Sequence, residues 1–312
     1  MKTLSKFKQL LILFVVLIVI TILITTFLKG KTDLKNKPIS IGIFSKNGLD
    51  YDLPNLKSKH IFTVWGKEYD DKKEEYFNIF DKNISPDEPN ILTVEPWPIL
   101  GENSNRDLLL TNIRDDKYHG VIKQLCTSIE SKSKSKIIIR LGHEMELYET
   151  SRYPWASKNS ELFKQAFQKW VETCKQYSKK ILYMFSPASN NGQEKYYPGS
   201  EYVDYVGMSW YSYPAYEWYT YKEVYNFYKI MDDKYPRLVQ YNKPIIAAEF
   251  GVAGTMDHKK EMLSIIKYKQ ELKNRYPNLV ALTLFNDVTE SWVPNKIELP
   301  DWTIPQEIIK EI

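Results

Sequence analysis

Histidine and cysteine are scarce in this chain of 312 residues, which contains four His and two Cys. The histidines are scattered along the chain: His60, His119, His143 and His258. A zinc site needs three or four ligands at short, recognisable spacings, and neither these histidines nor the two cysteines show them. We therefore predict no metal site, and nothing in the sequence calls for another cofactor.

The two cysteines, Cys126 and Cys174, lie in stretches with the spacing of helices, residues 116–130 and 161–175. A disulfide between them is geometrically open if these helices pack side by side. Buried free cysteines are common in protein interiors, where they behave as small hydrophobic residues. We expect two separate buried thiols.

The chain also lacks a glycine-rich phosphate loop, because neither G-x-G-x-x-G nor a Walker sequence follows any candidate strand. This disfavours an open, doubly wound nucleotide-binding sheet. The basic residues are unevenly placed: residues 1–37 hold seven Lys and one Asp, so the net charge of +4 leaves the remainder slightly acidic. With no basic patch interleaved with aromatic residues, we expect no nucleic-acid partner.

Residues 10–28 form an apolar run without a charged residue, long enough to cross a bilayer as a helix. A cleaved signal peptide would have a shorter apolar region ending in small residues, whereas this run has no Ala and is followed by Lys-Gly-Lys. We predict a short tail at residues 1–9, a transmembrane anchor at 10–28 and a basic linker at 29–37. The protein would be a single-pass protein of the cell membrane with an extracellular catalytic domain.

Residues 38–312 contain no Gly/Ser-rich or low-complexity linker, which favours a single catalytic domain. Eight short apolar runs recur in it, at residues 39–44, 61–65, 91–95, 136–141, 181–185, 205–209, 244–248 and 280–285. Helical spacing between them is clearest at residues 161–178, 221–235 and 259–276, two of which end at a Tyr-Pro pair. Strands alternating with helices predict an α/β fold, a (β/α)8 TIM barrel preceded by one N-terminal transmembrane helix.

Charged residues follow the buried run at 137–139, where Arg140, His143 and Glu144 stand at the expected C-terminal end of a parallel strand. Active sites of barrels lie at that edge. A metalloprotease H-E-x-x-H motif is excluded because position 147 is Leu. Glu144 alone could simply cap a helix, but Glu249 ends the seventh predicted strand in the same way. Two carboxylates facing each other across a barrel mouth suit cleavage of a glycosidic bond.

Tryptophan gathers at the same edge, since six of the eight Trp fall at or just after predicted strand ends: Trp65, Trp97, Trp155, Trp210, Trp218 and Trp292. Trp170 and Trp302 do not. Flat rings with a polar N–H suit stacking on sugars, so the group favours a ligand cleft, although any one of them could be ordinary packing.

The motifs resemble those of glycoside hydrolase family 26, the retaining β-mannanases and related β-glycanases. R-L-G-H-E-M at 140–145 with R-Y-P-W at 152–155 is similar to the family's acid/base segment, and K-P-I-I-A-A-E-F-G at 243–251 to its nucleophile strand. The resemblance implies that Glu144 is the general acid/base and Glu249 the nucleophile. It also implies that His143 orients the acid and touches substrate, and that Tyr211 hydrogen-bonds the nucleophile.

Two departures concern substrate contacts. Glu146 and Leu147 stand where the family commonly has Asn-Gly, and the eighth strand lacks a Trp, for which Trp292 or Phe285 would substitute. β-1,4-glucan, mixed-linkage glucan, β-mannan and a self-made exopolysaccharide all stay open as substrates. The resemblance predicts a membrane-anchored endo-β-glycanase that trims an exopolysaccharide beside a synthesis or export system. The alternative is a non-catalytic carbohydrate-binding barrel at the cell surface.

Overall fold

The computed structural model describes residues 38–45, 56–82, 88–99, 106–150, 153–288 and 296–311. Eight parallel strands close into a barrel in chain order, and β1 pairs with β8. They are β1 (Ser40–Ser45), β2 (Ser58–Val64), β3 (Asn90–Glu95), β4 (Ile137–Leu141), β5 (Ile181–Phe185), β6 (Tyr205–Ser212), β7 (Ile245–Val252) and β8 (Leu279–Asn286). The predicted (β/α)8 barrel is confirmed.

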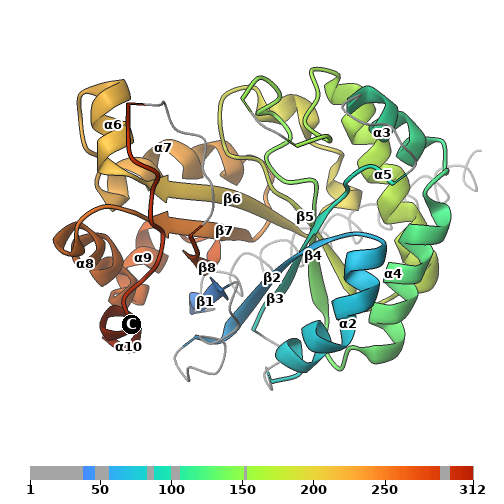
Figure 1. The fold of residues 1–312 in the computed structure, drawn as a ribbon, viewed down its shortest axis with the longest axis horizontal. Helices are drawn as coiled ribbons and strands as arrows, with labels where there is room; N and C mark the ends of the chain where they lie inside the picture. The colour runs from blue at the N-terminus through green and yellow to red at the C-terminus, as the bar shows by residue number, and fades with distance from the viewer. Residues whose placement is uncertain are drawn as a thin grey trace, which may run out of the picture.

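Helices surround the strands, with α2 to α5 on one side of the barrel and α6 to α10 on the other (Figure 1). The α-helices are α2 (Lys67–Phe80), α3 (Arg106–Arg114), α4 (His119–Lys132), α5 (Ser160–Tyr177), α6 (Pro214–Tyr221), α7 (Phe227–Val239), α8 (Met256–Ser264), α9 (Lys269–Arg275) and α10 (Gln306–Glu311). Short 3-10 turns are η2 (Gln193–Tyr196), η3 (Ser200–Tyr202) and η4 (Ile265–Lys267). The main hydrophobic core lies between this helical layer and the strands.

Strands β4 and β7 show why unbroken apolar runs mark barrel strands. Every residue of both strands is buried, so neither strand has the polar alternation of a half-exposed sheet. The pairing of β6 with β7 shifts register after Met208, where Ser209 lies opposite Glu249 rather than Ala248. Such an irregularity re-aims side chains, and here it places Ser209 beside Glu249.

Two predicted helices are divided. The expected helix at 221–235 starts at the last residue of α6, is interrupted at residues 222–226 and resumes as α7, because Lys222 takes a left-handed conformation (φ 58°) and the side chain of Asn226 caps α7. Helix α7 also continues past the Tyr-Pro pair to Val239, with Leu238 buried in the core. The predicted helix at 259–276 is α8, η4 and α9.

The expectation of two free thiols is wrong. Helices α4 and α5 are neighbours on the outside of the barrel, and Cys126 and Cys174 form a disulfide with their Cα atoms 5.4 Å apart. Helical spacing alone placed both cysteines on buried faces but did not show that those faces meet.

Within the ranges given above, no helix is long and apolar enough to cross a membrane. The predicted tail, anchor and linker, residues 1–37, lie outside the described part of the chain.

Candidate active site

Glu249 on β7 lies at the mouth of the barrel against Arg140 on β4. One guanidinium nitrogen of Arg140 forms an ion pair with Oε1 of Glu249, and the Arg side chain is completely buried. Two serines hold the same guanidinium: its Nε donates to Ser186 Oγ at 2.8 Å and its Nη2 to Ser209 Oγ at 3.0 Å. A buried cation is thereby fixed opposite the carboxylate, with hydrogen bonds on several sides.

Tyr211, at the end of β6, donates its hydroxyl hydrogen bond to the other oxygen of Glu249, Oε2. Burial, and then the charge of Glu249, raise the pKa of Tyr211 well above its ordinary value, so the hydroxyl keeps its proton as a donor. Gly251 on β7 makes room for it, since a Cβ there would lie 2.5 Å from Cδ1 of the Tyr211 ring. Both oxygens of Glu249 therefore accept hydrogen bonds.

Glu144 follows β4 in a tight turn and is half-buried. Its backbone is left-handed (φ 55°), and its N–H donates to the carbonyl of Ser186 at 2.9 Å. A non-glycine residue in this conformation is strained, and such strain is concentrated at functional sites. Burial, followed by the negative charge of Glu249, raises the pKa of Glu144 to about 7, although a hydrogen bond from Ser209 opposes the shift.

An aromatic wall stands beside Glu144. His143 is buried, its ring centroid lies 4.7 Å from that of Tyr153, and its carbonyl accepts a 2.7 Å hydrogen bond from Trp155 Nε1. Tyr153 stacks on Trp155 at 4.6 Å. Burial, and then the charges of Glu144 and Glu249, raise the pKa of Tyr153, so its hydroxyl keeps its proton. Tyr153 belongs to the R-Y-P-W segment, but its place after no predicted strand gave no sign that it would line the site.

On the opposite side, Tyr211 packs against Phe285 and Trp302, with ring centroids 5.6 and 4.9 Å away. Phe285 occupies the end of β8, as the sequence suggested. The sequence does not place Trp302 at the rim, because it follows no predicted strand. In the structure Trp302 packs against Tyr211 and is only 5% exposed to solvent. The segment that carries it is tied down by Lys259, whose Nζ donates to the carbonyls of Asp301 at 3.0 Å and Thr303 at 2.5 Å.

The idea that the rim tryptophans offer open ring faces is wrong for three of them. Trp65, Trp155 and Trp210 are at most 2% exposed. Trp65 packs on Tyr118 and Trp210 on Phe227 and Phe250, so both belong to the layer between strands and helices.

The remaining rim tryptophans differ from one another. Trp97 is half-buried and donates to Glu95 Oε2 at 3.0 Å, and Trp218 is exposed. Trp292 lies outside the described residues.

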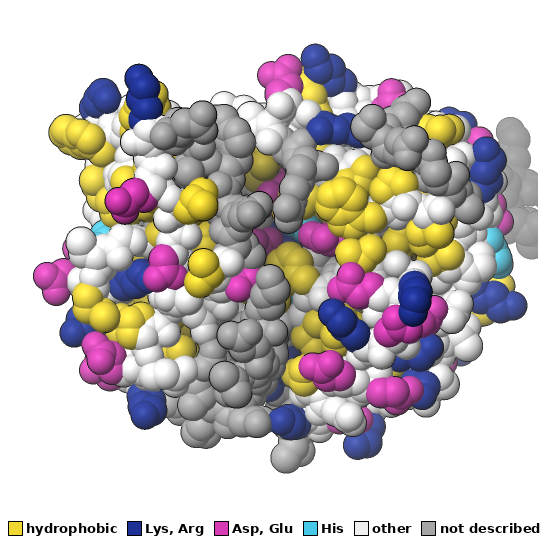
Figure 2. All heavy atoms as spheres, in the orientation of Figure 1, with side chains coloured by type: hydrophobic (Ala, Val, Ile, Leu, Met, Phe, Trp, Pro, Cys, Tyr) yellow, Lys and Arg dark blue, Asp and Glu magenta, His cyan; other side chains and the backbone are white. Residues whose placement is uncertain are grey.

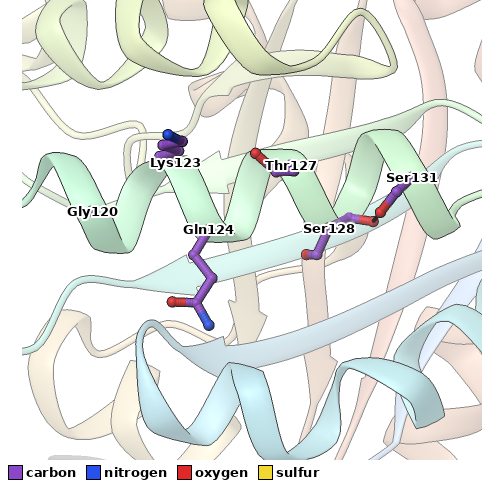
Figure 3. A pocket seen from close by; sticks show the side chains of 6 residues that line it. All are labelled: Gly120, Lys123, Gln124, Thr127, Ser128 and Ser131. Carbon is purple, nitrogen blue, oxygen red and sulfur yellow. Dashed lines mark hydrogen bonds between the residues drawn. The ribbon is translucent and has the colours of Figure 1, made fainter.

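Acidic side chains lie beside hydrophobic ones at the centre of the face drawn in Figure 2. A separate hollow on the outer side of α4 is lined by Gly120, Lys123, Gln124, Thr127, Ser128 and Ser131 (Figure 3). It faces α2, where Gln124 donates to Asp70 at 2.8 Å, and it contains none of the residues around Glu249. Across the parts of the chain that are described, no three His, Cys, Asp or Glu side chains are grouped to hold a metal ion.

Solved structures share this architecture. With BoMan26A, a β-mannanase from Bacteroides ovatus, the chain has a TM-score of 0.61 and 12% identity over 92% of its own length and 90% of the other chain. GH26C from Muricauda sp. gives 0.59 and 14% identity over 91% and 87%. A β-mannanase from a symbiotic protist of the termite Reticulitermes speratus, complexed with gluco-manno-oligosaccharide, gives 0.57 and 13% identity over 83% of each chain. No curated protein sequence matches.

Two carboxyl groups lie at the mouth of a parallel eight-stranded barrel, one of them ion-paired and the other with a raised pKa. This arrangement is typical of a glycoside hydrolase. The model of glycosyl hydrolase family 26 matches residues 119–297, more than half of the chain. This protein belongs to glycosyl hydrolase family 26.

Proposed function

We propose that the protein is a retaining endo-β-1,4-glycanase in which Glu144 is the general acid/base and Glu249 the nucleophile. The observation that supports this assignment is the difference between the two carboxyl environments. Glu249 faces the buried Arg140 cation and the Tyr211 hydroxyl, whereas the pKa of Glu144 is raised to about 7. Carboxyl groups whose environments separate them in this way divide the acid and nucleophile roles.

In the first step, Glu144 gives its proton to the glycosidic oxygen while a Glu249 oxygen bonds to the anomeric carbon. The leaving sugar departs with that proton, and a glycosyl ester remains on Glu249. His143 and Tyr153 line the acid's side of the site, where they orient it and contact the sugar.

The second step reverses the role of Glu144. Once Glu249 is esterified, its negative charge is gone, and with it the second-largest cause of the raised pKa of Glu144. The carboxylate form of Glu144 becomes easier to reach, so the group can take a proton from the incoming water. Water oxygen bonds to the anomeric carbon, the ester bond breaks, and both carboxyl groups return to their starting forms.

β-Mannan is the substrate best supported by the similar structures, two of which are β-mannanases. Glu146, beside the acid turn, and Phe285, at the end of β8, stand where the family commonly has other residues. β-1,4-Glucan, mixed-linkage glucan and an exported exopolysaccharide are therefore alternative substrates. A membrane anchor at residues 10–28 would hold the enzyme at the cell surface, where it would trim a polymer leaving the cell. Recovery of the full chain from culture medium instead of the membrane fraction would contradict the anchor.

Product analysis tests the reaction. The full chain is incubated with β-mannan, carboxymethyl-cellulose and mixed-linkage glucan beside its Glu144→Gln variant, and NMR follows the anomeric configuration of the first products. We expect oligosaccharides from one polymer with retained configuration, and far fewer from the variant in the same time. Inverted products would overturn the nucleophile assignment, and binding without any cleavage would indicate a carbohydrate-binding barrel.

A further inference from the structure

Helix α6 exposes aromatic side chains and buries a charged one, the reverse of an ordinary surface helix. Ala215, Trp218 and Tyr219 share its outward face at spacings of three and four residues, and Trp218 and Tyr219 are 59% and 43% exposed. Its inward position is taken by Glu217, which is 4% exposed. Neighbouring exposed aromatic rings over a buried carboxylate are unusual on a surface helix, so the stripe points to a binding role.

The conformation that presents this stripe is well fixed. Glu217 accepts hydrogen bonds from the backbone N–H of Tyr213 at 2.9 Å and of Tyr225 at 2.7 Å, which ties both ends of the α6 segment to one side chain. Pro214 occupies the first turn, where its missing N–H costs nothing, and Lys222 ends the helix. The two aromatic rings are therefore held outward by the folded chain.

A series of aromatic contacts connects the active site with the residue that precedes α6. Tyr211 contacts Glu249, Trp302 packs on Tyr211, and the Trp302 ring centroid lies 6.2 Å from that of Tyr213, the residue that precedes α6. The Tyr213 hydroxyl also donates to the carbonyl of Glu298 at 2.6 Å. A row of aromatic side chains thus leads from the nucleophile to α6, which lies at the edge of the molecule on the side toward which β6 points (Figure 1).

We propose that Trp218 and Tyr219 form a second polysaccharide-binding platform, which holds a β-linked chain outside the cleft that cleaves it. This inference rests on the proposed glycanase function. The rings are flat and carry an indole N–H and a hydroxyl, which suits the apolar faces and hydroxyl rims of sugars. The aromatic contacts between the catalytic site and the start of α6 favour the same polymer as the ligand over a lipid surface.

Kinetics on long and short substrates test the platform. The Trp218→Ala/Tyr219→Ala double variant of the full chain is compared with wild type on β-mannan and mannotetraose, and on carboxymethyl-cellulose and cellotetraose. We expect KM for the cleaved polymer to rise roughly tenfold, a loss of about 1.4 kcal/mol, with kcat unchanged and the tetraose cleaved as by wild type. Equal losses on polymer and tetraose, or an unchanged KM for the polymer, would overturn the proposal.

Tyr268→Ala is the matched control, because Tyr268 is also an exposed aromatic residue, at 60%. It lies at the opposite end of the barrel, since its neighbour Lys269 is near Lys57 and Glu88. Its KM for the polymer should equal that of wild type.

Electrophoresis in gels that contain the same polymers distinguishes the platform from the glycanase function, because a protein that binds the polymer migrates more slowly. If wild type cleaves no polymer, the glycanase function is wrong, and the migration of the two proteins then tests the platform by itself. Loss of retardation in the double variant supports the platform. Retardation equal to that of wild type, or no retardation of either protein, overturns it.

Discussion

Arg140 and Glu249 form a buried ion pair between β4 and β7, strands that are separated by two others around the barrel. The Arg side chain is inaccessible to water and Glu249 is 5% exposed. Such a pair contributes little net stability compared with apolar residues, but each partner strongly destabilises the fold when the other is removed. The site therefore depends on both members being present.

Arg140→Met should destabilise the folded protein by about 3–5 kcal/mol, because Glu249 would remain as a buried charge without its cation. Urea denaturation at pH 7 measures the loss. The double variant Arg140→Met/Glu249→Gln is the control, since it removes both charges and should recover part of the stability. An Arg140→Met protein as stable as wild type would show that Glu249 finds another partner or stays hydrated.

Tyr211→Phe should lower kcat/KM by roughly 10- to 100-fold, since a buried hydrogen bond to a charged group contributes about 1.5–3 kcal/mol. Steady-state kinetics on the cleaved polymer test this. Tyr213→Phe is the matched control, because that hydroxyl bonds a backbone carbonyl and not Glu249. Equal activity of both variants would remove Tyr211 from the reaction.

The strands and the ends of strands were predictable because they depend on local burial. Ile137, Ile138 and Ile139 form an unbroken β-branched run, and a strand buried on both faces needs no polar alternation. Once the strand order of the barrel is inferred, Glu144 and Glu249 lie at the same end of it for any conformation of the loops. The ion pair of Arg140 with Glu249 was not foreseen, since it depends on where two side chains point inside the closed barrel.

Tryptophan burial was the least predictable feature. A Trp at a strand end can turn toward the ligand or into the helical layer, and only tertiary packing decides, as the buried Trp65 and Trp210 show. Trp302 reaches Tyr211 because Lys259 binds two carbonyls of its segment, a contact between residues more than 40 positions apart. Neither outcome has a local signal in the sequence.

The pH profile of kcat/KM should fall above about pH 7 by about tenfold per pH unit, because Glu144 must carry a proton to act as the acid. Steady-state rates between pH 4 and 10 would show this basic limb. In Glu144→Gln the limb should disappear while kcat drops about 10²- to 10⁴-fold. A limb that persists in this variant would belong to another group.

Loss of the disulfide between Cys126 and Cys174 should cost about 2–4 kcal/mol, because the bond joins residues 48 positions apart and restricts the unfolded chain. Urea denaturation with and without reductant measures the difference. The Cys126→Ser/Cys174→Ser variant should match the reduced wild type and show no response to reductant. Identical midpoints for oxidised and reduced wild type would contradict the bond.

Glu144→Gln should make the protein more stable above pH 7, although it lowers kcat. The pKa of Glu144 rises from an ordinary value of 4.5 to about 7 on folding, so the unfolded chain loses this proton first as pH increases. Wild-type stability therefore declines between about pH 4.5 and 7 and stays reduced at higher pH, by on the order of 1–3 kcal/mol for this half-buried group. Gln has no proton to lose, so the Tm advantage of the variant should be small at pH 4.5 and reach a plateau near pH 8.

Glu149→Gln, an exposed position in the same loop, should show no such pH-dependent gain. An advantage that is the same at pH 4.5 and pH 8 would mean that the stabilisation comes from packing and not from the carboxyl proton.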